Sequence, residues 1–242
     1  MNDRRVCLVV GAGDSTGGAI ARRFAREGFV TCVTRRDRDK LAGLCGKIES
    51  AGGEAHAYGS DARREEQVID LIESIESDIG PIEVAVFNIG GNINFSILEF
   101  TARKFYKVWE MGCFAGFLMG REVAKRMVPR GKGTILFTGA TASIRGGSGY
   151  AGFAAAKFGL RALSQSMARE LGPLGIHVAH VIIDGMIDTP WIRENFVKEV
   201  AAKPPAGLLN PDDIAQNYWM LHRQPRSAWS QELDLRPWAE HW

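Results

Sequence analysis

A tyrosine and a lysine in the stretch GYAGFAAAKFG are the residues whose types and spacing could do chemistry. A helix turns about 100° per residue, so Tyr150 and Lys157 would lie within about 20° of one face and about 10 Å apart along the axis. Helical side chains lean towards the N-terminus, so Lys157 would reach back towards Tyr150. A phenol hydroxyl can stabilise negative charge on a carbonyl oxygen, and a nearby ammonium group lowers the pKa of a tyrosine from about 10.

Each of these two residues also has a purely structural interpretation. Aromatic residues are frequent at helix starts, so Tyr150 could pack in the core. Lys157 could be an ordinary lysine on an exposed helix face. Among other polar residues nearby, His180 is expected to be a satisfied core histidine and Asp184 a turn-forming carboxylate.

The elements that must position this pair alternate along the chain as short apolar runs and longer amphipathic stretches. This alternation predicts an α/β fold, a doubly wound parallel sheet of about seven strands with helices on both faces. No linker or repeat is visible, so we expect one domain over residues 1–242. The expected strands are 5–10, 29–34, 54–60, 82–88, 133–139, 176–183 and 231–236, and the expected helices are 15–28, 37–51, 63–79, 101–129, 149–172 and 211–222.

Composition and charge exclude several classes of protein. The chain has 242 residues, of which 45% are hydrophobic and 24% charged, and a net charge of +2, which indicates neither a nucleic-acid nor a membrane partner. The cysteines and histidines show no ligand spacing, so we expect no metal site and a reducing compartment. The start MNDRRVCLVV is too polar for a signal peptide, and no run approaches the length of a membrane span. We therefore expect a cytoplasmic protein.

The stretch VVGAGDSTGGAIARRFAREG follows the first expected strand and opens the first expected helix. In such a turn the backbone N–H groups can approach a pyrophosphate, aided by the positive end of the helix. A glycine-rich turn can also serve geometry alone, but the strand–turn–helix context near the start of the chain favours dinucleotide binding. The candidate residues of this phosphate loop are Gly11, Gly13, Ser15, Thr16 and Gly17.

The end of the second expected strand bears on the choice of cofactor. A free ribose 2′-hydroxyl usually meets an acidic residue there, whereas this chain has Arg35 and Arg36. Guanidinium groups suit a 2′-phosphate by charge and by bidentate geometry, which favours NADP(H) over NAD(H). The alternative is a solvated basic loop, since further basic residues follow.

With these motifs in place, the sequence resembles the short-chain dehydrogenase/reductase family over nearly its whole length. Its glycine loop is similar to the family's TGxxxGxG, with Ser15 in place of the middle glycine. Asp61 matches the family's adenine contact, and FNIG keeps Asn88 and Gly90 of the family's NNAG. Thr189 matches a threonine that contacts the nicotinamide carboxamide in relatives.

The resemblance implies a Rossmann fold with strand order 3-2-1-4-5-6-7 and an NAD(P)-dependent oxidoreductase acting on a small molecule. It also implies a homodimer or homotetramer. Residues 186–210, which hold KPPAGLLNP, would form a lid over the substrate by analogy with the family, or otherwise a surface helical hairpin.

The family's usual catalytic set of Asn, Ser, Tyr and Lys is largely replaced. Aligning the motifs places Gly112 at the Asn position, Ala140 at the Ser position and Phe153 at the Tyr position. Only Lys157 matches. Thr141 is adjacent to the missing serine and is a candidate to replace it in part.

The spacing YAGFAAAK is similar to the Tyr-x6-Lys pattern of bacterial enoyl-acyl-carrier-protein reductases. The catalytic hypothesis is therefore an NADPH-dependent reductase in which Tyr150, Lys157 and Thr141 act on an enone, enoyl or carbonyl substrate. A second hypothesis is an ordinary carbonyl reductase or alcohol dehydrogenase with a rearranged acid. A third is a catalytically degenerate NADP(H)-binding protein with a sensing or structural role.

Overall fold

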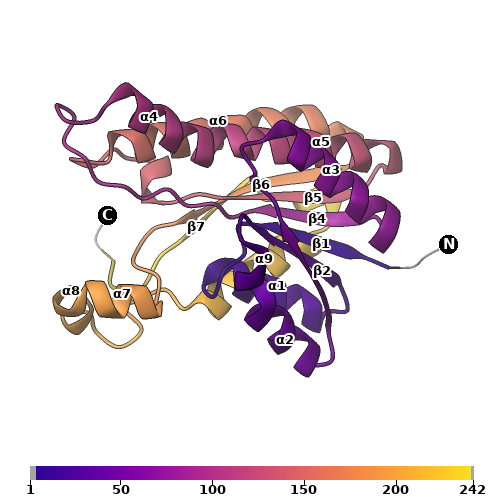
Figure 1. Cartoon of the computed structure of the whole chain (residues 1–242), viewed down its shortest axis with the longest axis horizontal. Coiled ribbons are helices and arrows are strands. Elements are labelled where there is room, and N and C mark those ends of the chain that lie inside the picture. The colour runs from indigo at the N-terminus through magenta and orange to yellow at the C-terminus, as the bar shows by residue number, and fades with distance from the viewer. Residues whose placement is uncertain (1–3, 241–242) are drawn as a thin grey trace.

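A parallel sheet of seven strands runs through the centre of the computed structural model, which describes residues 4–240 (Figure 1). The strand order is β3-β2-β1-β4-β5-β6-β7, and each pairing is parallel. The predicted α/β class and strand order are therefore confirmed. The strands are β1 (Val6–Val10), β2 (Val30–Arg35), β3 (Glu54–Gly59), β4 (Ile82–Phe87), β5 (Gly133–Thr138), β6 (Ile176–Ile183) and β7 (Glu232–Leu235).

The strands form where apolar, often β-branched, residues run together. Every residue of β1 and β6 is buried, because helices cover both faces of a parallel sheet. Strand β3 lies at one edge and is only partly buried, in keeping with its mixed sequence EAHAYG. The strand order reverses between β1 and β4, and this switch point is where such sheets usually bind ligands.

The helices form a layer on each face of the sheet (Figure 1). One layer packs on one core cluster through α1, α2 and α9, and the other packs on a second cluster through α3, α5 and α6. The short helices α7 and α8 lie away from both layers (Figure 1). The helices are α1 (Thr16–Arg26), α2 (Ala42–Ser50), α3 (Glu65–Ser74), α4 (Ala102–Trp109), α5 (Ala115–Met127), α6 (Ala151–Leu171), α7 (Pro190–Asn195), α8 (Val197–Ala201) and α9 (Pro211–Arg223).

Three of the long helices expected from the sequence are not α-helical throughout. The helix expected over 63–79 continues after α3 as a π-helical segment, Ile75–Ile79. The helix expected over 101–129 contains a π-helical segment, Glu110–Phe114, between α4 and α5. The helix expected over 37–51 begins as a 3₁₀ turn, Arg38–Leu41, before α2. Hydrophobic periodicity predicts that a helix is present, but it does not resolve a local change in the hydrogen-bonding pattern.

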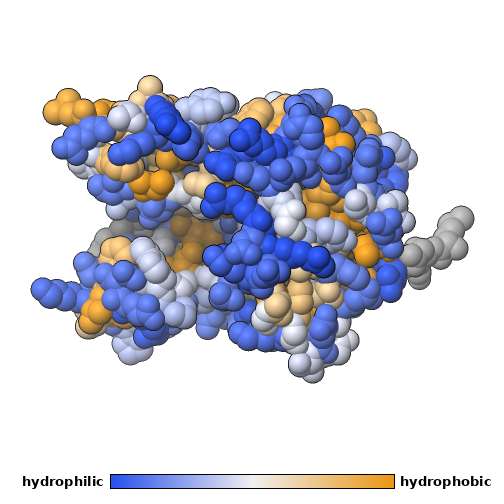
Figure 2. Space-filling model, in the orientation of Figure 1, coloured by the Kyte–Doolittle hydropathy of each residue, from blue (hydrophilic) through white to orange (hydrophobic). Residues whose placement is uncertain are grey.

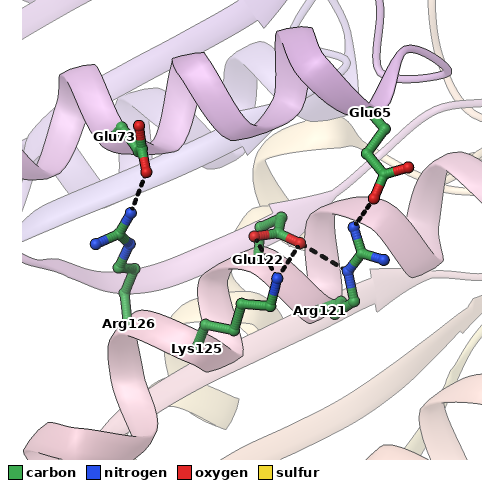
Figure 3. A network of polar contacts seen from close by, with 6 residues as sticks. All are labelled: Glu65, Glu73, Arg121, Glu122, Lys125 and Arg126. Carbon is green, nitrogen blue, oxygen red and sulfur yellow. Dashed lines mark hydrogen bonds and ion pairs between the residues drawn. The ribbon is translucent and has the colours of Figure 1, made fainter.

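Ion pairs join α3 to α5 on the surface of the molecule (Figure 3). Arg121 donates to both Glu65 and Glu122, and Lys125 donates to Glu122 at 2.8 Å. Burial alone would raise the pKa of Glu122, but hydrogen bonds from Lys125 and Arg121 outweigh it and lower that pKa. A further pair in this group is formed by Arg126 and Glu73.

Within residues 4–240, none of the helices combines the length and the apolar character that crossing a membrane requires.

Candidate active site

A cavity of about 850 Å³ lies at the C-terminal ends of the central strands. Its walls come from the glycine loop after β1, the segments after β4 and β5, the start of α6, and the segment that carries α7 and α8. Figure 2 shows the molecule hollowed on the side where α4 and α6 face α7 and α8. The position matches the site at which open α/β sheets bind ligands.

The glycine loop is tied closely to the neighbouring strands. The backbone N–H groups of Gly11 and Ala12 donate to the Thr34 carbonyl at 3.1 and 3.0 Å. The Asn88 side chain donates to the Gly11 carbonyl at 3.1 Å. Gly11 has φ +87°, and a Cβ on Gly17 would lie 2.7 Å from the Gly11 oxygen. Only glycine therefore allows the backbone to pass so close to the end of β4.

The first turn of α1 offers unused hydrogen-bonding groups to the cavity. Thr16 is buried, and its Oγ1 has no hydrogen-bond partner among residues 4–240. Ser15, the N-cap residue, makes no capping hydrogen bond through its side chain there. Both residues line the cavity. A glycine cradle, an unpaired hydroxyl and a helix N-terminus together fit the pyrophosphate of a dinucleotide.

The glycine loop carries the first testable prediction, which concerns Gly18→Ala. A Cβ on Gly18 would lie 2.2 Å from the Gly13 carbonyl oxygen, so the loop must shift. We expect a loss of about 1–3 kcal/mol in stability, seen as a fall in Tm of roughly 2–12 °C in thermal unfolding followed by circular dichroism. Gly13→Ala is the matched control, since a Cβ there meets nothing within 4 Å. Equal Tm values for the two variants would contradict the prediction.

Lys157 is buried beneath the cavity and bonded to the ends of two strands. Its Nζ donates to the Ile89 carbonyl at 3.1 Å and to the Thr138 carbonyl at 2.8 Å. Its exposed fraction is 2%. Burial lowers the pKa of Lys157 to about 8. The structure therefore excludes the interpretation of Lys157 as an exposed helix lysine.

Tyr150 and Phe153 lie at the start of α6, and both line the same cavity as Lys157. Tyr150 is the N-cap residue, with φ −110° and ψ 20°, so the ideal helix geometry expected over 149–172 begins only at Ala151. Its hydroxyl has no protein hydrogen bond among residues 4–240. The Phe153 ring centroid is 5.9 Å from Lys157 Nζ. Tyr150 thus lines the cavity rather than packing wholly in the core.

Thr141 belongs to a polar cluster that sequence patterns did not reveal. Its hydroxyl donates to Asp184 Oδ1 at 2.5 Å, and Asp184 is only 1% exposed. Arg145 Nη2 lies 3.4 Å from Asp184 Oδ1, and Arg236 Nη2 lies 3.8 Å from Oδ2. Asp184 therefore links the end of β6 to the loop after β5 and to the segment after β7, in addition to the turn role expected for it. Arg145, which lines the cavity, was not predicted as a site residue.

A second polar chain runs beneath the loop after β5. Ser143 Oγ accepts from the Ala140 N–H at 3.1 Å and lies 3.3 Å from His180 Nε2. His180 Nδ1 is 3.4 Å from Glu232, which in turn accepts from Arg161 at 2.6 Å. Burial lowers the pKa of His180 to about 4, so its ring is neutral near pH 7. The structure places His180 in the core, as the sequence predicted, but its Nδ1 has no hydrogen-bond partner among residues 4–240, so the ring is not fully satisfied.

The position that the motif alignment matches to the family's asparagine is filled by close packing. Gly112 lies in the π-helical segment, and a Cβ on it would lie 3.0 Å from Ala156 Cβ. A larger side chain there would require α6 to shift. Ala140, at the usual serine position, lines the cavity without a polar side chain.

Most of the predicted cofactor residues line the cavity, whereas three do not. Arg35 and Arg36 come directly after Thr34, whose carbonyl accepts hydrogen bonds from the N–H groups of the glycine loop. They therefore lie near the end of the cavity that the glycine loop lines. Asp61 forms a bidentate pair with Arg63 at 2.9 and 2.6 Å, which lowers the Asp61 pKa. The predicted residues that line the cavity are Gly11, Gly13, Ser15, Thr16, Gly17, Asn88, Gly90, Thr141, Tyr150, Lys157 and Thr189.

Comparison with known proteins establishes the family. The family model described as short chain dehydrogenase matches residues 5–199. The chain therefore belongs to the short-chain dehydrogenase family and is an NAD(P)-dependent oxidoreductase. A short-chain dehydrogenase/reductase of Armillaria gallica is 30% identical over 211 residues, which are 86% of this chain and 79% of that protein.

Solved structures agree over nearly the full length. A short-chain dehydrogenase from Rhodopseudomonas palustris is 49% identical, with a TM-score of 0.84 over 97% of this chain and 99% of that one. A variant of actinorhodin polyketide ketoreductase, solved with NADPH, is 25% identical, with a TM-score of 0.89 over 98% and 97% of the two chains.

Proposed function

We propose that this chain is an NADPH-dependent reductase that acts on a small enone, enoyl or carbonyl compound. The observation that carries this proposal is that Tyr150 and Lys157 line the same cavity as the glycine loop. A hydroxyl without a hydrogen-bond partner among residues 4–240 and a buried cation then share one cavity with the loop proposed to bind the cofactor. The glycines that shape the loop and the unpaired Thr16 hydroxyl support the fit of a dinucleotide.

Different residues of the chain would contact different parts of the cofactor. The glycine loop and the first turn of α1 would hold the pyrophosphate, and Asp61 would lie at the adenine end. Thr189 Oγ1 accepts from the Ile192 N–H at 3.1 Å, which leaves its own proton free to donate to a carboxamide. When bound, the nicotinamide ring supplies the hydride. The other residues proposed for cofactor binding are Gly11, Gly13, Ser15, Thr16, Gly17, Asn88, Gly90 and Lys157.

Lys157 is suited to bind a ribose hydroxyl. A charged ammonium group has three N–H donors, and two of them bond to the carbonyls of Ile89 and Thr138. These bonds fix Nζ in place and leave one donor for the cofactor. The same positive charge favours negative charge that develops on a substrate oxygen nearby.

Tyr150 is proposed to donate its hydroxyl hydrogen to the substrate oxygen. For a ketone, the oxygen must gain a proton as the alcohol forms. For an enone, the oxygen becomes an enolate, which needs stabilisation of its charge but no complete proton transfer in the same step. Because Gly112 and Ala140 supply no polar side chains, the site suits alkene reduction better than carbonyl reduction. Thr141 could assist only through the proton that it now donates to Asp184.

Arg35 and Arg36 support NADPH over NADH. Arg36 is exposed at the end of β2, and no acidic residue occupies either position. A carboxylate there would bind a free 2′-hydroxyl, whereas a guanidinium matches a 2′-phosphate.

A second candidate function is an NADP(H)-binding protein without catalysis. The observation that favours it is that the positions of the family's Asn and Ser are Gly112 and Ala140. The presence of Tyr150 in the same cavity as Lys157 argues for the catalytic proposal, because cofactor binding alone would use the lysine but does not require a phenol hydroxyl there.

The lid over residues 186–210, the homodimer or homotetramer and the cytoplasmic location stay predictions. Met186, Ile192, Phe196 and Glu199 line the cavity, which supports a role of this segment in covering the substrate. The exposed aromatic residues on α4, α5 and α6 support an interface between copies of the chain; they are Phe105, Tyr106, Phe117 and Phe158.

The test begins with fluorescence titration of NADPH and NADH, followed by turnover on enoyl thioesters, cyclic enones and ketones. We expect NADPH to bind more tightly, and the double change Arg35→Ser/Arg36→Ser to weaken NADPH by roughly 10- to 100-fold while affecting NADH much less. Arg169→Ser, an exposed arginine at the far end of α6, is the matched control. Binding without turnover on any compound would favour the second candidate function.

A further inference from the structure

We propose that Arg145 binds a carboxylate group of the substrate, so that the physiological substrate is a largely apolar enone, enoyl or carbonyl compound that carries an acid group. This inference rests on the proposed function, because it assigns a substrate class to the same cavity. It concerns a residue that belongs to none of the family motifs described above.

Arg145 lies on the substrate side of the cavity. It is on the loop between β5 and α6, four residues after Thr141 and five before Tyr150, and it lines the cavity with both. The segment that carries α7 and α8 adds the apolar side chains of Ile192 and Phe196 to the lining of the same cavity. Apolar side chains and a guanidinium in one cavity fit a ligand with an apolar body and an anionic end.

The guanidinium of Arg145 has donors to spare. It carries five N–H donors, and among residues 4–240 its one hydrogen bond is the contact with Asp184 at 3.4 Å. That contact is longer than the 2.7–2.9 Å or so typical of a charged pair. The Arg145 side chain is 45% exposed. Most of its hydrogen-bonding capacity is therefore available to a ligand in the cavity.

Asp184 does not depend on Arg145 alone for compensation of its charge. Thr141 donates to Oδ1 at 2.5 Å, and Arg236 lies 3.8 Å from Oδ2. When Arg145 turns to a ligand, the buried carboxylate keeps a hydrogen bond and a cation. The cost of stranding a buried charge is thus avoided. Asp184 acts as a tether that holds Arg145 at the cavity without saturating it.

Glu199 also lines the cavity, and it raises the alternative that the substrate carries a cationic group instead. It lies on the exposed helix α8, and no ion pair joins it to Arg145. A substrate with a cationic group would use Glu199 instead. Arg145 is held by the protein beside the loop that carries Thr141, whereas Glu199 has no partner in residues 4–240 that would fix it. The site is therefore better organised to bind an anionic group of the substrate than a cationic one.

The test uses a cyclic enone carboxylic acid and its methyl ester, which differ at one end by the negative charge and by one methyl group. For the wild type, kcat/KM should favour the acid. In Arg145→Met the acid should lose roughly 10- to 100-fold more than the ester, and Arg145→Lys should restore part of the preference. Added salt should weaken the preference of the wild type. Arg169→Met, which removes a charge far from the cavity, should leave the preference unchanged. Equal losses for acid and ester in Arg145→Met would overturn the proposal.

Binding distinguishes failure of this inference from failure of the proposed function. The same acid and ester are titrated into the NADPH-bound protein, and quenching of the NADPH fluorescence is measured. Selective binding of the acid to the wild type but not to Arg145→Met supports the carboxylate site even if no compound turns over. Turnover of neutral enones without any preference for the acid, in binding or kcat/KM, overturns the carboxylate site and leaves the reductase intact.

Discussion

Replacing Tyr150 by phenylalanine is expected to lower kcat by about 10²- to 10⁴-fold on whichever enone or ketone the wild type reduces. The change removes one hydroxyl and leaves the ring that lines the cavity in place. Because that hydroxyl has no protein partner among residues 4–240, its removal leaves no buried group unsatisfied. NADPH affinity and Tm should therefore stay close to the wild-type values. The measurement is steady-state NADPH oxidation, with fluorescence titration and thermal unfolding on the same samples.

Phe153 provides a sharp control for this prediction. Its ring centroid is 5.9 Å from Lys157 Nζ, and the motif alignment predicts that it stands at the family's tyrosine position. In the double variant Tyr150→Phe/Phe153→Tyr, a hydroxyl returns to the usual spacing, and ketone reduction should recover at least in part. If Tyr150→Phe leaves kcat unchanged, Tyr150 has no part in the reaction, and Thr141 becomes the remaining hydroxyl to examine by substitution.

The fold could be predicted well because its signals are local and strong. Buried strands such as β1 and β6 appear in the sequence as runs of Val, Ile and Leu, and glycine or proline marks most of their ends. The residues 176–183 expected for a strand are those of β6. Helix starts were less certain, since Tyr150 has non-helical dihedral angles that no periodicity encodes.

The glycine loop and Lys157 could also be placed from the sequence, because both belong to continuous motifs. The cluster of Thr141, Arg145 and Asp184 could not. Asp184 is far from the other two in the chain and meets them only because β6 lies beside β5 in the sheet. A single sequence contains no signal for such pairing across strands.

The missing asparagine shows a different limit of sequence reasoning. A glycine at position 112 looks like the loss of a functional group. In the structure it also allows Ala156 to lie so close that a Cβ on Gly112 would approach to 3.0 Å. Gly112 is therefore part of the packing between the π-helical segment and α6, where a larger side chain would press on Ala156, the residue before Lys157.

Lys157 carries the second large prediction, which concerns pH. Burial lowers its pKa to about 8, so the amine of the free protein loses its charge as pH rises through that value. A neutral amine is a weaker donor to a ribose hydroxyl, and it no longer stabilises negative charge on the substrate. We expect NADPH affinity to fall by about 5- to 10-fold between pH 7 and pH 9.5. Lys157→Met should lower kcat/KM by at least about 10²-fold at pH 7.

The variant Lys157→Arg tests whether the pH dependence of NADPH binding comes from loss of the positive charge at position 157. A guanidinium stays protonated over the whole range, so NADPH binding to this variant should show no transition near pH 8, whatever its absolute affinity. Stability should change in the opposite sense to affinity. Between about pH 8 and pH 10.5, the folded wild type holds fewer protons than the unfolded state, because Lys157 loses its proton at a lower pH when it is buried. Relative to Lys157→Met, the free energy of unfolding of the wild type should therefore rise by up to about 3 kcal/mol as the pH increases through this window. A wild-type affinity that is flat across pH 8, or a stability difference that is constant with pH, would show that Lys157 is charged in the folded protein well above that pH.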